Sequence, residues 1–190
     1  MHAPTLKTPN LILAEPIIHR GMDMTHYVEW LNNPMVVRYS EQRHRTHTRE
    51  SQYRYLEAYV HNDDMYWDIR ITGYPIGAIT AILDHDNLVA NVGIIIGDMR
   101  YWGRGYACEA YGAVCEYLFS EKYRRIEAGT MACNEAMIRV LDKLEFKREA
   151  VIKDHFLLKS KPQDLYVYAK TRKAKVVPIR SGQKEPQSPE

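Results

Sequence analysis

The sequence predicts a mixed α/β fold, of the α+β kind, as a single domain over residues 1–170. Three short apolar runs follow one another between Met65 and Ile96 with only turn residues between them, which indicates an antiparallel meander. Segments with helical spacing of apolar residues precede and follow this meander. A chain of 190 residues, 45% of them hydrophobic, is long enough to bury a core.

The N-terminal part is expected to form a strand and then a helix. Residues 11–18 are an apolar run, and Pro16 places this strand at a sheet edge or a kink. Asp23 is suited to cap a helix over residues 24–31, because its short side chain accepts hydrogen bonds from the first N–H groups of a helix. The Asn-Asn-Pro sequence at residues 32–34 then ends the helix.

A second helical region is expected between residues 34 and 60. One or two helical turns over residues 34–39 come first. Thr48 then caps a longer helix that continues to residue 60. Helical spacing predicts that its inward face comprises Tyr55, Leu56 and Tyr59.

The meander itself is expected to contain three strands, over residues 65–71, 76–83 and 88–96. Glycine and proline at residues 72–75 favour a turn, as do the aspartates and asparagine at residues 84–87. Because both turns are short, consecutive strands are expected to pair antiparallel. The third strand leads directly into a glycine-rich loop.

The C-terminal half is expected to alternate helices and strands. A helix over residues 105–119 is followed by a strand over residues 124–131 and a helix over residues 134–144. Strands over residues 151–158 and 165–169 form a closing hairpin. The first of these helices carries apolar residues at helical spacing, namely Ala107, Ala110, Tyr111, Val114 and Leu118.

The charge of the chain is small and unevenly placed. The formal net charge is +2, but residues 171–190 contain five basic and two acidic residues, which gives them +3 and leaves the body at −1. A body without a basic surplus argues against a nucleic-acid partner. The tail at residues 171–190 is rich in Pro, Gln, Lys and Ser, so we expect it to be disordered.

The sequence also indicates a reduced, cytoplasmic protein without a membrane partner. It contains no apolar run long enough for a transmembrane helix and no signal-peptide core at its start. Cys108 and Cys115 fall on one predicted helix, about 10 Å apart, which is too far for a disulfide. Neither they nor Cys133 show metal-ligand spacing, so no metal is expected.

The stretch from Arg100 to Ala107, Arg-Tyr-Trp-Gly-Arg-Gly-Tyr-Ala, is the most informative part of the sequence. It lies between a predicted strand and the start of a predicted helix, where unpaired N–H groups and the helix dipole favour an anion. Gly103 and Gly105 allow close approach of a ligand to the backbone. The stretch lacks the Lys-Ser/Thr of a Walker loop and the third glycine of a dinucleotide loop.

The Arg-x-x-Gly-x-Gly spacing resembles the pyrophosphate loop of the GNAT (GCN5-related) N-acetyltransferases. The predicted element order is similar to that family over almost the whole body, and the block Asn134–Phe146 resembles the family's late motif. Trp30–Pro34 near the start and Trp102–Ala110 in the central loop resemble its RimJ/RimL-type branch. The resemblance implies the GNAT fold, a mostly antiparallel sheet splayed between two parallel strands and flanked by helices. It also implies acetyl-CoA as co-substrate.

The resemblance assigns a set of residues to the co-substrate. The glycine loop would hold the pyrophosphate, the backbone of the preceding strand would hold the pantetheine arm, and Asn134 would hydrogen-bond the arm or cap its own helix. The full set is Ile94, Ile95, Ile96, Arg100, Trp102, Gly103, Arg104, Gly105, Tyr106, Ala107, Asn134 and Met137.

Two positions depart from the family pattern. Many members have a tyrosine in the late helix that protonates the leaving thiolate, and the spacing from Asn134 places Leu141 there. Cys133 and Tyr106 are weak substitutes for it. Glu145 stands where the family usually has glycine, so we expect a positive φ at this residue, at a cost of about 1 kcal/mol.

The general base and the acceptor are less well defined by the sequence. A base must deprotonate the amine, and the weak candidates are Glu41, His44, Asp84 and His85. A cationic segment that contains Arg38, Arg43, His44 and Arg45 favours an anionic acceptor, such as a nucleotide-linked amino sugar, although it is also compatible with a solvated charged face.

Several alternatives stay open. The acceptor is a small-molecule amine or a peptide N-terminus, as in the RimJ/RimL enzymes. A different hypothesis is that the protein is a module that binds acyl-CoA without turnover, which the absence of the late tyrosine favours. The oligomeric state is open, and a homodimer is one option.

Overall fold

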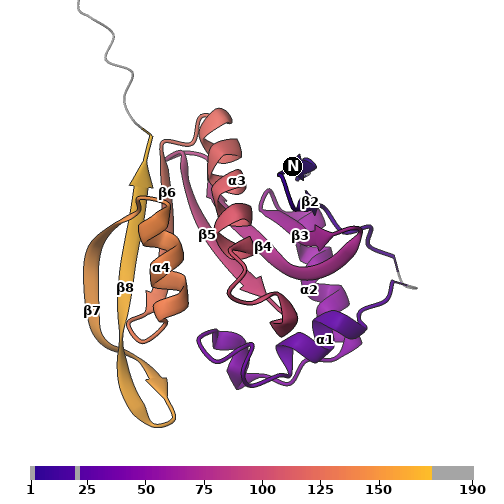
Figure 1. Ribbon diagram of the computed structural model, residues 1–190, viewed down its shortest axis with the longest axis horizontal. Helices are drawn as coiled ribbons and strands as arrows, with labels where there is room; N and C mark the ends of the chain where they lie inside the picture. Colours follow the sequence, from indigo (N-terminus) through magenta and orange to yellow (C-terminus); the bar gives the residue numbers. More distant parts are fainter. Residues whose placement is uncertain (1–2, 20–21, 173–190) are drawn as a thin grey trace, which may run out of the picture.

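The computed structural model describes residues 3–19 and 22–172 (Figure 1). Within them, the strands are β1 (Leu6–Lys7), β2 (Ile12–Ala14), β3 (Met65–Ile71), β4 (Tyr74–Asp84), β5 (Val89–Ile96), β6 (Arg125–Met131), β7 (Lys147–Leu158) and β8 (Lys161–Thr171). The helices are α1 (Thr25–Leu31), α2 (Arg49–His61), α3 (Tyr106–Ser120) and α4 (Glu135–Lys143), with short 3-10 helices η1 (Glu41–His44) and η2 (Met99–Tyr101).

The strands form one sheet in the order β1-β2-β3-β4-β5-β6-β8-β7. All neighbours pair antiparallel except β5 and β6, which are parallel. The mixed α/β class and the antiparallel meander of β3, β4 and β5 are therefore confirmed. Helix α3 connects the two parallel strands and crosses one face of the sheet (Figure 1).

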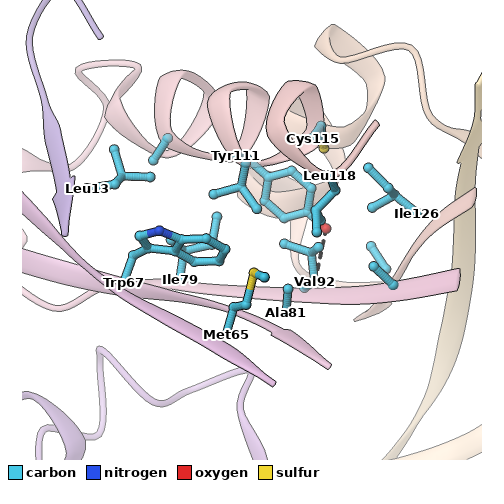
Figure 2. Close-up of a cluster of buried hydrophobic side chains, with 14 of the residues drawn as sticks. Leu13, Met65, Trp67, Ile79, Ala81, Val92, Tyr111, Cys115, Leu118 and Ile126 are labelled. Atoms are coloured by element: carbon cyan, nitrogen blue, oxygen red, sulfur yellow. Dashed lines mark hydrogen bonds between the residues drawn. The ribbon is translucent and has the colours of Figure 1, made fainter. Parts of the chain in front are cut away.

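The two faces of the sheet carry two separate hydrophobic clusters, because side chains along a strand alternate between faces. The larger cluster lies under α3 and includes Trp67, Ile79 and Val92. Figure 2 shows these three side chains directed from the sheet toward the helix. The smaller cluster lies on the opposite face, where Tyr66 of β3 packs with residues of α1 and α2, among them Tyr27.

The stretch over which β5 and β6 pair is much shorter than either strand. It pairs only Val89 with Arg125, Ala90 with Ile126 and Asn91 with Glu127. After these three positions β5 continues beside β4 alone, and β6 continues beside β8 alone. The sheet is therefore split between the C-terminal ends of β5 and β6.

Tyr111 of α3 marks the point at which the strands separate. Its side chain is fully buried, and its hydroxyl donates a hydrogen bond of 2.9 Å to the carbonyl oxygen of Val92, the first residue after the paired stretch (Figure 2). A buried carbonyl without a donor is costly. The ring of Phe146 packs edge-on against Tyr111, with centroids 5.7 Å apart.

The N-terminal region differs in detail from the expectation. The strand expected over residues 11–18 is limited to Ile12–Ala14, and a further short strand, β1, pairs with it at the sheet edge. Pro16 explains the early end, because proline has no N–H to donate to a neighbouring strand. Asp23 accepts a hydrogen bond from the Thr25 N–H, although the capping position itself is Met24.

Other expected boundaries shift as well. Residues 34–39 form turns, and the 3-10 helix η1 follows them. Thr48 caps α2 as expected, in a capping box with Ser51. Tyr55 was expected to face inward but is 40% exposed. Strand β8 continues to Thr171, and the remainder of the expected tail, residues 173–190, lies outside the described residues.

We expect Tyr111→Phe to lower the melting temperature by roughly 2–6 °C, because the Val92 carbonyl loses its donor at a cost of about 1–2 kcal/mol. Tyr117→Phe is the matched control on the same helix, since its hydroxyl has no hydrogen-bond partner among the described residues. Thermal unfolding followed by circular dichroism measures both. An equal shift for the two variants would show that the Tyr111 hydroxyl has no special role.

Candidate functional site

The glycine-rich loop joins the end of β5 to the start of α3. Asp98, which is 8% exposed, accepts a hydrogen bond from the Arg100 N–H at 3.0 Å and so begins the 3-10 helix η2. The Arg100 guanidinium also bonds this carboxylate, at 2.6 Å from Nη2 to Oδ2, and it lowers the pKa of Asp98. The charge of Arg100 is thus balanced within the loop. Arg104 is exposed, and its guanidinium lies 5.7 Å from the centroid of the Tyr101 ring.

Gly103 and Gly105 both adopt a left-handed backbone, with φ of 72° and 85°. A side chain at either position would be strained. A Cβ added at either glycine would meet no heavy atom within 4 Å, so the loop surface is open rather than packed. The requirement for glycine therefore comes from the backbone conformation.

The loop presents a row of backbone donors. The first helical hydrogen bond of α3 runs from the Glu109 N–H to the Gly105 carbonyl, and Gly105 offers no side chain to cap the helix. Among the described residues, the N–H groups from Gly103 to Cys108 have no hydrogen-bond acceptor. A helix start with such donors and an open surface is suited to an anion.

The gap between β5 and β6 begins beside this loop. The N–H of Gly97 donates to Ile76 of β4, so odd-numbered residues at this end of β5 face β4 and even-numbered residues face the gap. The Ile96 carbonyl accepts a hydrogen bond of 2.8 Å from the indole nitrogen of Trp102. Since Tyr111 holds the Val92 carbonyl, Ile94 is left with its backbone N–H and carbonyl directed into the gap.

The other side of the gap is formed by β6 and the start of α4. Asn134 caps α4, and its Oδ1 accepts a hydrogen bond of 3.3 Å from the Met137 N–H. Its Nδ2 donates to the Thr130 hydroxyl at 3.0 Å. Each of these amide groups can form one more hydrogen bond. Asn134 therefore links β6 to α4 and keeps hydrogen-bonding capacity for a ligand.

The two residues that depart from the family pattern, Leu141 and Glu145, lie in the last turn of α4 and just after the helix. Leu141 is fully buried in the core under α3, so it is a packing residue there. Glu145 has a φ of 62°, which confirms the expected positive value. The N–H groups of Glu145 and Phe146 bond the carbonyls of Asp142 and Leu141, which is the Schellman ending that usually contains glycine.

A cavity lies on the face of the sheet opposite α3, between β4–β5 and the segment that contains α1, η1 and α2. Its volume is about 360 Å³. Gly93, Ile94 and Ile95 of β5 form part of its wall, so the same strand residues border both the gap and this cavity, which we call the β5 pocket. Aromatic side chains form much of the remaining wall, namely Tyr27, Trp30, Tyr55 and Tyr66.

His47 lines the β5 pocket, with 7% of its surface exposed. Its Nδ1 lies 2.9 Å from Nε2 of Gln52, and its Nε2 lies 3.3 Å from the carbonyl oxygen of Gln42. These contacts fit a ring whose Nε2 donates to the Gln42 carbonyl and whose Nδ1 accepts from the Gln52 amide. His47 is therefore a satisfied structural residue that connects η1 to α2.

The cationic residues considered for the acceptor are not all at the β5 pocket. Arg45 lines it and is exposed. Arg43 is instead paired with Glu41 at 2.7 Å and donates to the Leu157 carbonyl of β7. Arg38 is exposed and stacks on Tyr39, with its guanidinium 5.0 Å from the ring centroid.

The base candidates lie in two other places. Glu41 and His44 are exposed and 3.7 Å apart on η1. Asp84 accepts two hydrogen bonds from Asn87 in the β4–β5 turn, and those bonds lower its pKa. His85, in the same turn, lies 2.9 Å from the Tyr123 hydroxyl. This turn is at the beginning of β5, roughly 20 Å from its end at the glycine loop.

Asp68, a buried carboxylate beside the β5 pocket, was not expected from the sequence. Asp68 is 1% exposed on β3, accepts a hydrogen bond from the Tyr27 hydroxyl, and is paired with Arg70 at 2.7 Å. The available signal was a lone carboxylate inside an otherwise largely apolar strand. Among the described residues, no three His, Cys, Asp or Glu side chains are grouped to hold a metal, and no helix is long and apolar enough to cross a membrane.

The structure thus combines a split parallel strand pair with a loop whose N–H groups have no acceptor among the described residues. A family model described as an acetyltransferase (GNAT) domain matches residues 11–147. The chain therefore belongs to the GNAT acetyltransferase family, as the motifs indicated.

One curated relative, "Uncharacterized N-acetyltransferase p20" of Bacillus licheniformis, is 30% identical over 89 residues. That match covers 46% of this chain and about half, 49%, of the relative. A GNAT-family acetyltransferase from Bacillus anthracis has a similar structure, with a TM-score of 0.72 and 21% identity over 88% of this chain and 98% of that one.

Two further solved structures are similar in fold. The microcin C7 self-immunity acetyltransferase MccE, in complex with acetyl-CoA and AMP, has a TM-score of 0.73 and 15% identity, over 87% of this chain and 94% of that one. RimL, a ribosomal L7/L12 α-N-protein acetyltransferase in complex with coenzyme A, has a TM-score of 0.75 and 15% identity, over 88% of this chain and 98% of that one.

We expect Glu145→Gly to raise the melting temperature by about 1–3 °C. Glycine removes the left-handed backbone penalty of about 1 kcal/mol, partly offset by its greater freedom in the unfolded chain. Glu145→Ala is the control, because it removes the exposed side chain but keeps the Cβ. Thermal unfolding decides between the two, and a gain for alanine equal to that for glycine would assign the effect to the side chain instead.

Proposed function

We propose that this protein is an acetyl-CoA-dependent N-acetyltransferase that acts on a primary amine. The observation that supports this most directly is the position of β5. Its end borders the loop with unpaired N–H groups and the split in the sheet on one side, and the β5 pocket on the other. A donor and an acceptor bound at these two places would meet at Ile94 and Ile95.

The residues of the loop and the gap fit the chemistry of coenzyme A. Its pyrophosphate matches the row of N–H donors from Gly103 to Cys108, with Arg104 as an added cation. Its amide-containing arm matches the unpaired backbone of Ile94, in the manner of an added strand. The thioester supplies the acetyl group. The N–H groups at the end of β5 would polarise its carbonyl.

The proposed acceptor carries an anionic group together with its amine. Arg45 is on the wall of the β5 pocket, whereas no carboxylate lines that pocket among the described residues. A cation at the wall favours an anionic substrate and disfavours a polyamine. A nucleotide-linked amino sugar satisfies these conditions, and the similar MccE structure contains AMP beside acetyl-CoA. A peptide N-terminus is the second candidate, supported by the similar fold of RimL.

A panel of amines tests the proposed function as a whole. Free thiol release from acetyl-CoA is followed with UDP-amino sugars, aminoglycosides, spermidine and short peptides. We expect release with at least one anionic amine and less release with spermidine. If acetyl-CoA binds but no amine increases thiol release, the alternative of a binding module without turnover is favoured.

We expect Gly105→Glu to abolish acetyl-CoA binding, because a carboxylate and a side chain would both be placed where the pyrophosphate is proposed to lie. Gly73→Glu is a closely matched control. Gly73 has a φ of 86° against 85° for Gly105, and a Cβ at either residue meets no atom within 4 Å. Both variants carry the same backbone strain, so calorimetry should show a loss only for Gly105→Glu. Parental affinity in a folded Gly105→Glu protein would contradict the assignment.

We expect Arg45→Gln to raise the KM for an anionic acceptor by about 5–30-fold, on the scale of a lost hydrogen bond to a charged group, with little change in kcat. Added salt should reduce this difference, since it screens an exposed charge. Arg54→Gln is the control, because Arg54 is an exposed cation on α2 that pairs with Glu50 and is not part of the β5 pocket. An unchanged KM in Arg45→Gln at low salt would exclude Arg45 from the acceptor site.

A further inference from the structure

If the proposed function holds, a side chain at the β5 pocket must accept a proton from the acceptor amine. Few side chains of the pocket wall could do so. Amines with ordinary pKa values carry a proton near neutral pH. Among the described residues, the titratable groups on the wall are His47, Arg45 and the tyrosines Tyr27, Tyr55 and Tyr66. Both ring nitrogens of His47 are engaged with Gln52 and Gln42, and Arg45 cannot accept a proton.

Tyr27 differs from the other two pocket tyrosines in its hydrogen bond. Its hydroxyl donates to Asp68, a carboxylate that is 1% exposed behind the pocket wall. The Tyr55 hydroxyl lies instead 3.2 Å from that of Tyr59, and the Tyr66 hydroxyl hydrogen-bonds that of Tyr27. Tyr27 therefore connects the pocket to the one buried carboxylate within hydrogen-bonding reach of its wall, as far as the described residues show.

We infer that Tyr27 and Asp68 together form the proton acceptor for the amine, an inference that rests on the proposed function. Tyr27 is the group that would touch the acceptor, because it lines the pocket. Its oxygen already accepts from the Tyr66 hydroxyl and keeps one further acceptor position. Asp68 acts through Tyr27. Arg70 donates to the other carboxylate oxygen, Oδ2, at 2.7 Å, while Tyr27 donates to Oδ1.

The proton transfer is balanced without any further reactant. The ammonium N–H bond breaks and its proton passes to the Tyr27 oxygen, while the Tyr27 hydroxyl proton passes to Asp68. The products are a neutral amine, a neutral carboxylic acid at Asp68 and a tyrosine that is again protonated. One positive and one negative charge are lost together, which suits an apolar aromatic pocket.

The surroundings of Asp68 favour this role. Burial raises the pKa of Asp68, whereas the hydrogen bonds from Tyr27 and Arg70 act in the opposite direction and favour the anion. A carboxylate with a raised pKa is a better base. The ionisable groups that face the pair are Arg70 and Tyr66 of β3, and Tyr66 packs in turn against Tyr55 and Tyr59 of α2.

The test compares Tyr27→Phe with the parent over about pH 6 to about pH 10, using the panel amine with the fastest thiol release. Near pH 7, kcat should fall by about 100-fold or more while KM changes little. The deficit should shrink as the pH approaches the pKa of the amine, because an amine that is already neutral needs no base. Asp68→Asn should show the same pH-dependent deficit.

Tyr59→Phe is the control, since Tyr59 packs against Tyr66 without lining the pocket, and its hydroxyl lies beside that of Tyr55 rather than a carboxylate. It should keep the parental kcat and pH profile. Calorimetry with acetyl-CoA on Tyr27→Phe should give the parental affinity. Thiol release by the parent tests the proposed function, whereas the ratio of variant to parent rates at each pH tests only this pair. A deficit in Tyr27→Phe that is absent, or equal at every pH, overturns the inference.

Discussion

The parallel pairing of β5 and β6 ends at Asn91 and Glu127, and beyond these residues each strand has a neighbour on one side only. Backbone groups exposed in this way must find other partners, because buried N–H and carbonyl groups without hydrogen bonds are destabilising. Tyr111 of α3 supplies the donor for Val92, and Trp102 of the loop supplies the donor for Ile96. Ile94 between them has no such donor among the described residues, and we propose that the co-substrate bonds it.

The gap between β5 and β6 explains the positions of the glycine loop and of the β5 pocket. Because β5 leads directly into the loop, the row of N–H donors at the start of α3 is placed at one end of the gap. Because side chains alternate along β5, Ile94 packs against the cluster under α3 whereas Ile95 packs against the cluster on the opposite face, and Gly93, Ile94 and Ile95 form part of the wall of the β5 pocket. The two proposed substrates therefore approach one strand from different directions.

The features that were predicted from the sequence are those with a local cause. Turn residues define the meander, and the positive φ of Glu145 follows from its position after a helix that ends in the family manner. The features that were missed depend on contacts between distant segments. Asp68 lies 41 residues from Tyr27 in the sequence, and no local pattern around either residue predicts their hydrogen bond. Arg43 appeared to belong to a cationic wall, but Glu41 and a carbonyl of β7 occupy its guanidinium.

Hydrogen exchange of individual backbone amides, with and without acetyl-CoA, tests the central claim most directly. The account predicts that acetyl-CoA slows exchange at the N–H groups from Gly103 to Cys108 and at Ile94, the groups left without a protein acceptor. Exchange at Gly97, whose N–H already bonds Ile76, should change far less. Protection that is absent from Gly103–Cys108 and from Ile94 while acetyl-CoA is bound would contradict the account.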